Sequence, residues 1–227
     1  MKTRNEIILL CKEYDITNYK INVDGSIDVK GDVYLSFKGL TKLPLNFNKI
    51  IKGSYNCSNN QLTSLEGAPV YVGGAFKCSR NQLTTLNFAP KSVKGAYECN
   101  NNKITSLRGV PNYIASNFHC DYNNLTSLDG SPKKIRTDFS CWGSGLTSFK
   151  GCPEHVGGNF SAFGHYITSL DGCPNFIGGS FCCDAQYLST LRGLGEVKGE
   201  IHVGNKELVE SFRNTFERNK IIDYILS

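Results

Sequence analysis

The sequence predicts a mainly β repeat solenoid, and two observations lead to this fold class. Equivalent aliphatic positions recur with gaps of 20 to 22 residues along most of the chain. Each repeat also carries an aromatic residue and a cysteine two positions apart, so both side chains point to one face of an extended strand. One such unit is too short to bury that face alone, and we expect stacked neighbours to supply the core. The aliphatic positions are Leu40, Leu62, Leu83, Ile104, Leu125, Leu146, Ile167, Leu188 and Leu208.

Residues 1–30 are predicted to form an N-terminal cap. Thr3 and Glu6 fit a capping box ahead of Ile7, which predicts a short helix. Apolar and polar residues alternate over residues 16–37, which predicts strands. The Asp24-Gly25 pair is typical of a hairpin turn and predicts one between the first two strands.

Residues 31–205 are predicted to be the solenoid. The repeat is aromatic-x-Cys-x-x-Asn-x-Leu-Thr-Ser-Leu-x-Gly-x-Pro. Its Asn falls where the chain leaves the strand, and the amide can satisfy backbone groups there. The Gly-x-Pro removes a donor where a helix could start, so we expect one parallel sheet of short strands with an extended back side. The ladder positions are Asn60, Asn81, Asn102 and Asn123.

Residues 206–227 are predicted to form a helical cap. Leu208, Val209, Phe212 and Phe216 recur at helical spacing. A helix sealing the last coil is one interpretation. A tail that binds a partner or dimerises is the other.

Composition argues against several classes of protein. The 227 residues carry a formal net charge of +5, without the dense basic stripe of a nucleic-acid binder. Near the N-terminus, the longest apolar stretch covers residues 7–11, which is too short for a membrane span or a signal peptide. Ten cysteines are too few for a disulfide scaffold, so we expect a reducing cytoplasmic compartment. The most basic cluster, Lys91, Lys94, Lys133, Lys134 and Arg136, is interpreted as a solvated surface.

The cysteines and histidines do not form a recognisable reactive centre. Five cysteines share the inward position that Leu35 and Ala162 occupy in other repeats, which favours a core role. No C-x-x-C pair occurs, and the four histidines fall at unrelated repeat positions. Cys182 must face outward, but no His or Asp lies at a spacing that would activate it. We therefore expect no enzyme, no metal and no cofactor. The five core cysteines are Cys57, Cys78, Cys99, Cys120 and Cys141.

The run Phe76-x-Cys78-x-x-Asn81-x-Leu83-x-x-Leu86 resembles the leucine-rich repeat signature. The sequence Cys-Ser-Asn-Asn-x-Leu-Thr-Ser-Leu-x-Gly is similar to short repeats encoded by bacteria and tailed bacteriophages. The resemblance covers roughly residues 31–205 and implies a right-handed solenoid that binds other macromolecules. A phage origin would imply a host defence or regulatory protein as the partner, in the bacterial cytoplasm.

The candidate binding site lies in a row of exposed residues, one from each coil, that directly follow the inward cysteine position. The residue type in this row changes in two neighbouring coils. This row holds small polar residues until Trp142 and Phe163, and polarity then returns. Exposed aromatic residues rimmed by polar groups mark interaction sites, and Trp is enriched at binding hot spots. The row reads Ser58, Ser79, Asn100, Asp121, Trp142, Phe163 and Asp184, and Tyr122 and His119 lie beside it.

The same coils also lose the ladder Asn. Its position is taken by Ser144, His165 and Gln186, and Tyr166 and Tyr187 follow the last two. Local repacking of a degenerate repeat, a partner-binding patch and a small-molecule pocket are all compatible with this change.

The sequence thus predicts a non-enzymatic protein-binding module that uses the exposed sheet face. One alternative is a protein that sequesters a nucleotide-like ligand through Trp142, Phe163, Tyr122 and His119. The other is an assembly role through the C-terminal helix. The sequence leaves the oligomeric state and the identity of the partner open.

Overall fold

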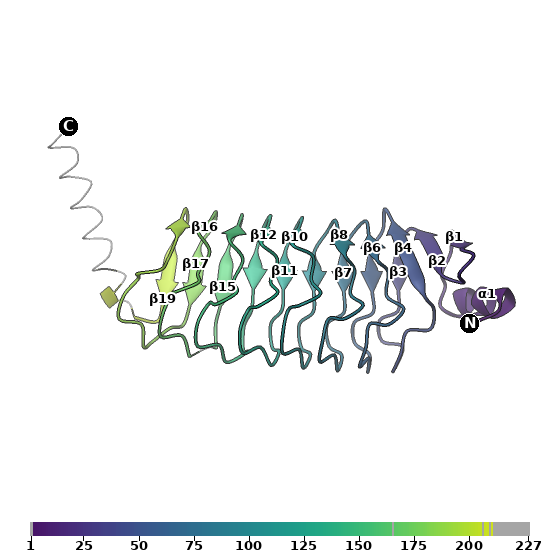
Figure 1. The fold of residues 1–227 in the computed structure, drawn as a ribbon, viewed down its shortest axis with the longest axis horizontal. Coiled ribbons are helices and arrows are strands. Elements are labelled where there is room, and N and C mark those ends of the chain that lie inside the picture. Colours follow the sequence, from purple (N-terminus) through teal and green to yellow (C-terminus); the bar gives the residue numbers. More distant parts are fainter. Residues whose placement is uncertain (1, 165, 206, 209, 211–227) are drawn as a thin grey trace, which may run out of the picture.

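The computed structural model describes residues 2–164, 166–205, 207, 208 and 210. They form an elongated solenoid in which short strands stack side by side along the long axis (Figure 1). The helix α1 (Arg4–Glu13) lies at the N-terminal end. No helix of the described residues is long and apolar enough to cross a membrane.

One face of the solenoid is a parallel sheet of nine strands, here called the front sheet. Each strand lies beside the equivalent strand of the next coil, so that Phe118, for example, pairs with both Tyr97 and Phe139. The strands are β3 (Val33–Tyr34), β5 (Tyr55–Asn56), β7 (Phe76–Lys77), β9 (Tyr97–Glu98), β11 (Phe118–His119), β13 (Phe139–Ser140), β15 (Phe160–Ala162), β17 (Phe181–Cys183) and β19 (Ile201–Val203).

The back side is extended as predicted, but it also forms two sheets of five strands each, so the expectation of one parallel sheet is wrong. The stacked extended segments carry backbone donors and acceptors that no helix satisfies, and they pair with the neighbouring coils. The first back sheet holds β1 (Tyr19–Ile21), β2 (Ile27–Lys30), β4 (Phe47–Ile51), β6 (Tyr71–Val72) and β8 (Ser92–Val93). The second holds β10 (Tyr113–Ile114), β12 (Lys134–Ile135), β14 (His155–Val156), β16 (Phe176–Ile177) and β18 (Glu196–Val197).

The secondary structure predicted at the N-terminus is confirmed. Thr3 and Glu6 form a complete capping box, and α1 buries Ile7 and Cys11. Strands β1 and β2 pair antiparallel across the Asp24-Gly25 turn. The helix predicted at the other end covers residues 206–227, of which only 207, 208 and 210 are described.

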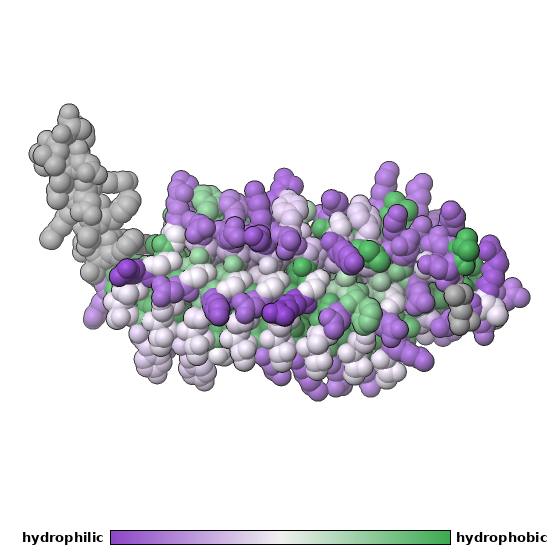
Figure 2. Space-filling model, viewed as in Figure 1, coloured by the Kyte–Doolittle hydropathy of each residue, from purple (hydrophilic) through white to green (hydrophobic). Residues whose placement is uncertain are grey.

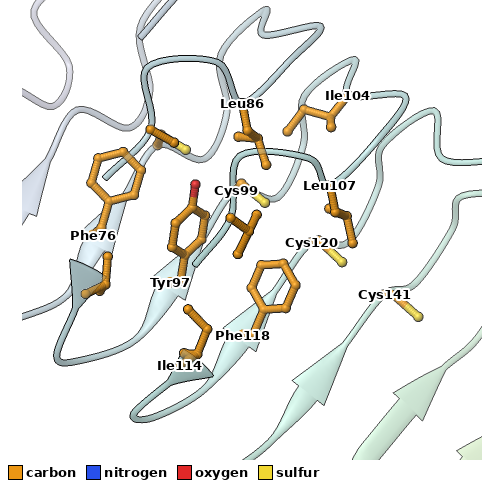
Figure 3. Packing of buried hydrophobic residues seen from close by; sticks show 14 of the residues in the cluster. Phe76, Leu86, Tyr97, Cys99, Ile104, Leu107, Ile114, Phe118, Cys120 and Cys141 are labelled. Atoms are coloured by element: carbon orange, nitrogen blue, oxygen red, sulfur yellow. The ribbon is translucent and has the colours of Figure 1, made fainter. Parts of the chain in front are cut away.

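Directly behind the front sheet the core holds a column of aromatic residues and a column of cysteines, and aliphatic residues from the other sides of each coil complete it (Figure 3). Aromatic rings from successive coils pack with centroid separations between 5.2 and 5.9 Å from Tyr55 to Phe160. The cysteines predicted to be inward are fully buried beside them. Burial disfavours the thiolate and raises the pKa of the Cys57 thiol to about 12. These cysteines are therefore packing residues in this structure.

The predicted asparagine ladder is present and fully hydrogen-bonded. Asn102 accepts from the backbone N–H of Leu83 at 3.0 Å and donates to the carbonyl oxygens of Cys78 and Cys99 at 3.1 Å. Asn60, Asn81 and Asn123 make the equivalent bonds in their coils. Each amide joins two coils at the corner where a regular ladder of backbone bonds ends.

A second corner ladder precedes the front strands. Ser54 donates its N–H to Asp32 Oδ1 at 2.7 Å, and Asn159 does the same to Asp138 Oδ1 at 2.7 Å. The glycines just before this corner allow close stacking, because a Cβ at Gly157 would lie 2.1 Å from the carbonyl oxygen of Arg136. This corner combines small residues with capping side chains.

Candidate functional site: an aromatic edge on the front sheet

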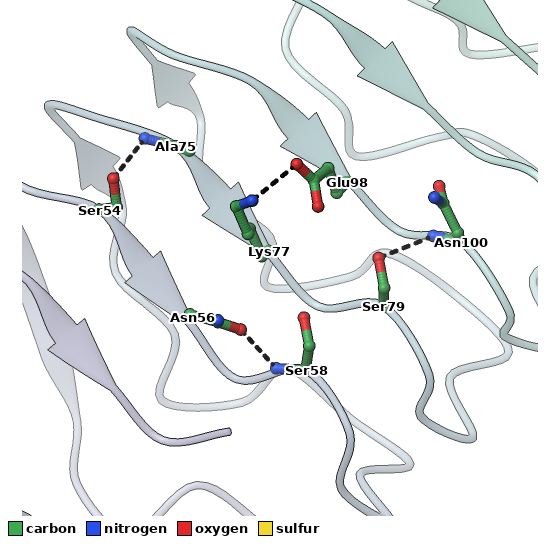
Figure 4. A network of polar contacts seen from close by, with 8 residues as sticks. All are labelled: Ser54, Asn56, Ser58, Ala75, Lys77, Ser79, Glu98 and Asn100. Carbon is green, nitrogen blue, oxygen red and sulfur yellow. Dashed lines mark hydrogen bonds and ion pairs between the residues drawn. The ribbon is translucent and has the colours of Figure 1, made fainter. Parts of the chain in front are cut away.

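The outer face of the front sheet changes character along the solenoid. Its N-terminal half carries a polar network (Figure 4). Lys77 Nζ lies 2.9 Å from Glu98 Oε1 on the neighbouring strand, and Ser79 Oγ accepts from the N–H of Asn100 at 3.2 Å. These side chains satisfy one another across coils, as on an ordinary solvated sheet face. Figure 2 likewise shows hydrophilic and hydrophobic side chains interspersed over the face that it views.

The aromatic pair predicted from the sequence is formed. The rings of Trp142 and Phe163 pack edge to face, with centroids 5.2 Å apart and an interplanar angle of 80°. Trp142 Nε1 donates to Ser161 Oγ at 2.7 Å, and its backbone N–H donates to Asp121 Oδ1 at 2.8 Å. The indole is therefore fixed in place while 38% of the residue stays exposed.

Tyr122 extends this pair by one coil. Its backbone has a φ of +53° and donates its N–H to the carbonyl oxygen of Trp142 at 2.6 Å. A Cβ at Gly143 would lie 2.6 Å from Cδ1 of the Tyr122 ring, so the glycine makes room for the ring. Tyr122 is 53% exposed. We call Tyr122, Trp142 and Phe163 the aromatic edge.

Two carboxylates bracket the aromatic edge. Asp121 is half-buried and accepts from the hydroxyl of Ser140 as well as from Trp142. Asp184 Oδ2 accepts from the N–H of Gly164 at 2.7 Å. The second oxygen, Asp184 Oδ1, is buried and has no hydrogen-bond partner within the described part of the chain. Both side chains hold the backbone that presents the rings.

The remaining predicted site residues are His119, Tyr166 and His165, and neither His119 nor Tyr166 makes a ring contact with the aromatic edge among the described residues. His119 is half-buried on β11, with Glu98 and Ser140 opposite it in register. Tyr166 is 68% exposed. His165 lies outside the described residues.

The ladder is altered in these coils, as the sequence indicates. Ser144 takes the Asn position, and its hydroxyl is buried without a hydrogen-bond partner in the described ranges. Gln186 is exposed. The corner is thus held differently from the one at Asn123.

Sequence reasoning placed Ser161 in the row beside the aromatic pair, but it missed Gly143 and the hydrogen bond that Ser161 makes. The signal in the sequence was a glycine at the repeat position where the preceding coils carry Asn101 and Tyr122, and all three residues have a positive φ in the structure. Ser161 lies one coil from Trp142 and one row away, so only the stacked geometry reveals the bond to the indole.

Cys182 has a neighbour that spacing did not suggest. His202 lies directly opposite it in the front sheet, and His202 Nε2 is 2.8 Å from Glu200 Oε2. Burial and the negative charge of Glu200 raise the pKa of the Cys182 thiol. An activated cysteine nucleophile needs the opposite shift.

Among the described residues, no three His, Cys, Asp or Glu side chains are grouped as a metal ion would require. Comparison of the chain with protein-family models, with curated proteins and with solved structures finds no match.

Proposed function

We propose that this chain is a non-enzymatic binding protein that uses the aromatic edge to contact another protein. The observation that supports this most directly is the state of Trp142. It is exposed, yet it is fixed by the hydrogen bond to Ser161 and by the packing against Phe163. A pre-organised aromatic side chain loses little conformational entropy on binding, which is why Trp so often dominates interface energetics.

The ring geometry favours a protein over a nucleotide as the partner. A base stacks between or on parallel ring faces. Here the rings of Trp142 and Phe163 stand at 80°, edge against face, so they offer no pair of parallel faces between which a base could insert. Such an aromatic pair suits burial against the surface of a partner protein, with the polar groups of Asp121 and Asp184 at its rim.

The kind of partner is proposed from the sequence of the repeats. The leucine-rich repeat resemblance, in its short bacterial and tailed-bacteriophage form, supports a partner in a bacterial host cell. We propose a host defence or regulatory protein that the solenoid holds inactive.

A matched pair of double variants tests this function. The test variant is Trp142→Ala/Phe163→Ala, and the control is Phe88→Ala/Tyr113→Ala, which removes two exposed aromatic side chains (63% and 46% exposed) away from the edge. Each immobilised protein is incubated with bacterial lysate after equal thermal melts have been verified. A protein captured by the wild type and the control, but lost by the test variant, is the expected result.

Two outcomes would contradict the proposal. A partner retained by both variants would place binding elsewhere on the molecule. Stabilisation of the wild type by free nucleotides, seen as a rise in melting temperature that the test variant loses, would show a small-ligand protein instead.

A further inference from the structure

The front sheet ends at β3 with an open strand edge. The N–H groups of Val33 and Leu35 donate to the carbonyl oxygens of Ser54 and Asn56 at 2.9 and 2.7 Å. In a parallel ladder, alternate residues direct their backbone groups to opposite sides. The N–H and C=O of Tyr34 and the N–H of Ser36 therefore point away from β5, and none of them has a backbone partner among the described residues.

A hollow of about 360 Å³ lies beside this edge. Helix α1 buries two residues against the core, and Tyr14, Asp15 and Ile16 after it line the hollow without a backbone hydrogen bond to β3 among the described residues. The situation differs in the first back sheet, where β1 pairs along β2. The hollow is lined by Tyr14, Asp15, Ile16, Asp32, Val33, Tyr34, Ser36 and Lys38.

Exposed aromatic and charged side chains surround the open edge. Tyr34 is 61% exposed, and Phe37 is 77% exposed with a φ of +57°. The carboxylates of Asp15 and Asp32 line the hollow at the start of β3, and Lys38 lies beyond its end. None of these three charged groups forms an ion pair within the described part of the chain.

We propose that this edge accepts an extended segment of a partner protein as a tenth strand of the front sheet. The segment runs parallel to β3, because every pairing in the front sheet is parallel and the edge presents the same pattern of groups to the next strand. A parallel segment begins beside Asp15 and Asp32 and ends beside Lys38. It therefore carries a basic residue at its N-terminal end and an acidic residue or a terminal carboxylate at its C-terminal end.

The shortness of β3 does not weaken the inference. It has two residues, and so do most strands of this sheet, which nevertheless pair over nine coils. Unpaired strand edges are templates for added strands, and natural proteins usually block them. Here the open edge coincides with a hollow and with exposed Tyr34 and Phe37 side chains that can anchor the added segment.

The test separates strand addition from side-chain binding. The Tyr34→Pro variant removes the outward N–H without removing a bond to β5, since that N–H points to the open edge. The residue before a proline must be extended, and Val33 already is. The Tyr34→Thr variant is the matched control, because it also loses the ring but keeps the N–H.

A displayed library of random nonapeptides is selected on the wild-type protein, and the enriched peptides are measured against both variants. We expect peptides with a basic residue preceding apolar ones and an acidic residue after them. Their affinity should fall about tenfold or more with Tyr34→Pro relative to Tyr34→Thr. It should be unchanged in Trp142→Ala/Phe163→Ala, so that this result is independent of the aromatic edge.

Three results would overturn the proposal. The first is the absence of enriched peptides. The second is equal binding by Tyr34→Pro and Tyr34→Thr, which would show that the backbone edge is not used. The third is self-association of the wild type that Tyr34→Pro abolishes, since the occupant would then be a second copy of this chain.

Discussion

Alkaline pH should destabilise this protein through its buried thiols. The five core cysteines are fully buried, and burial raises the pKa of each above its ordinary value of 9.0. A raised pKa in the folded state means that the thiol stays neutral there while the unfolded chain ionises. The stabilisation that comes from keeping these thiols neutral is fully present below the pKa of a thiol in the unfolded chain. It is lost as the pH rises toward the raised pKa of the folded state.

The magnitude follows from the difference between the two states. At a pH one unit above the unfolded pKa, each thiol lowers the free energy of unfolding by about 1.4 kcal/mol. Five such thiols lower it by about 7 kcal/mol, which is comparable to the total stability of many domains. We therefore expect a large drop in stability between about pH 8 and about pH 10.

The assay is urea unfolding followed by circular dichroism, in the presence of a reductant, at these two pH values. Burial also raises the pKa values of two tyrosines and three further thiols, which contribute in the same direction, so a variant of the core thiols is needed as a control. These groups are Tyr55, Tyr97, Cys152, Cys173 and Cys183. Cys78→Ala/Cys120→Ala is suitable because Ala162 stands naturally at the same repeat position. It should reduce the contribution of the five core thiols by about two fifths, or about 3 kcal/mol at pH 10. A free energy that changes by less than about 1 kcal/mol, or an identical drop in the variant, would refute the reasoning.

Three substitutions test other parts of the structure by urea or thermal unfolding. Asn102→Ala leaves buried backbone groups without partners and should lower the free energy of unfolding by about 3 kcal/mol. The control Gln82→Ala changes an exposed residue and should alter stability by less than about 0.5 kcal/mol. Similar losses in the two variants would contradict a structural role of the ladder. Tyr97→Phe should raise stability by about 1 kcal/mol, because the hydroxyl is buried without a partner among the described residues; a decrease would show that it has one. Gly157→Ala should lower the free energy of unfolding more than Gly145→Ala does. At Gly145 an added Cβ meets open space, so only the left-handed backbone opposes the change, at a cost of about 1 kcal/mol. Equal costs would mean that the coils are not tightly stacked at Gly157.

Much of the solenoid was predictable from the sequence, because the repeat places each residue type in one environment many times. Asn102 and its equivalents recur at one position, so their shared role could be inferred before any coordinates. The inward position of Cys99 could be inferred in the same way, because most repeats place a cysteine two residues after the aromatic residue of the strand. Repetition converts a weak single-residue signal into a strong one.

The features that were missed depend on contacts between coils. The two back sheets arise from segments as varied as Tyr71–Val72 and His155–Val156, which share only an inward aliphatic residue. The second corner ladder uses Asp32, Ser54 and Asn159, so no single residue type marks it. At the aromatic edge, Trp142 was predictable as an outlier in its row, but the bond to Ser161 was not.

The aromatic edge begins where the asparagine ladder ends, and the two changes are physically linked. An Asn at this corner, as at Asn123, fixes the backbone of two coils through several hydrogen bonds. The shorter side chain of Ser144 makes none of these in the described ranges, and Gly143 takes the positive-φ position that Tyr122 occupies in the preceding coil. The corner then has room for the Tyr122 ring over Gly143.

The core beneath this altered corner keeps the pattern of the repeat. Cys141 and Ala162 remain fully buried at the inward position, directly before Trp142 and Phe163 in the sequence. The surface of these coils thus differs from that of their neighbours without a change in the packing that stabilises the fold. The ring of Trp142 is exposed and that of Phe163 is half-buried, and neither belongs to the buried core. Removing both rings should therefore leave the melting temperature nearly unchanged, since side chains outside the core packing contribute little to stability. This separation of stability from surface chemistry is what allows the double variant to report on binding alone.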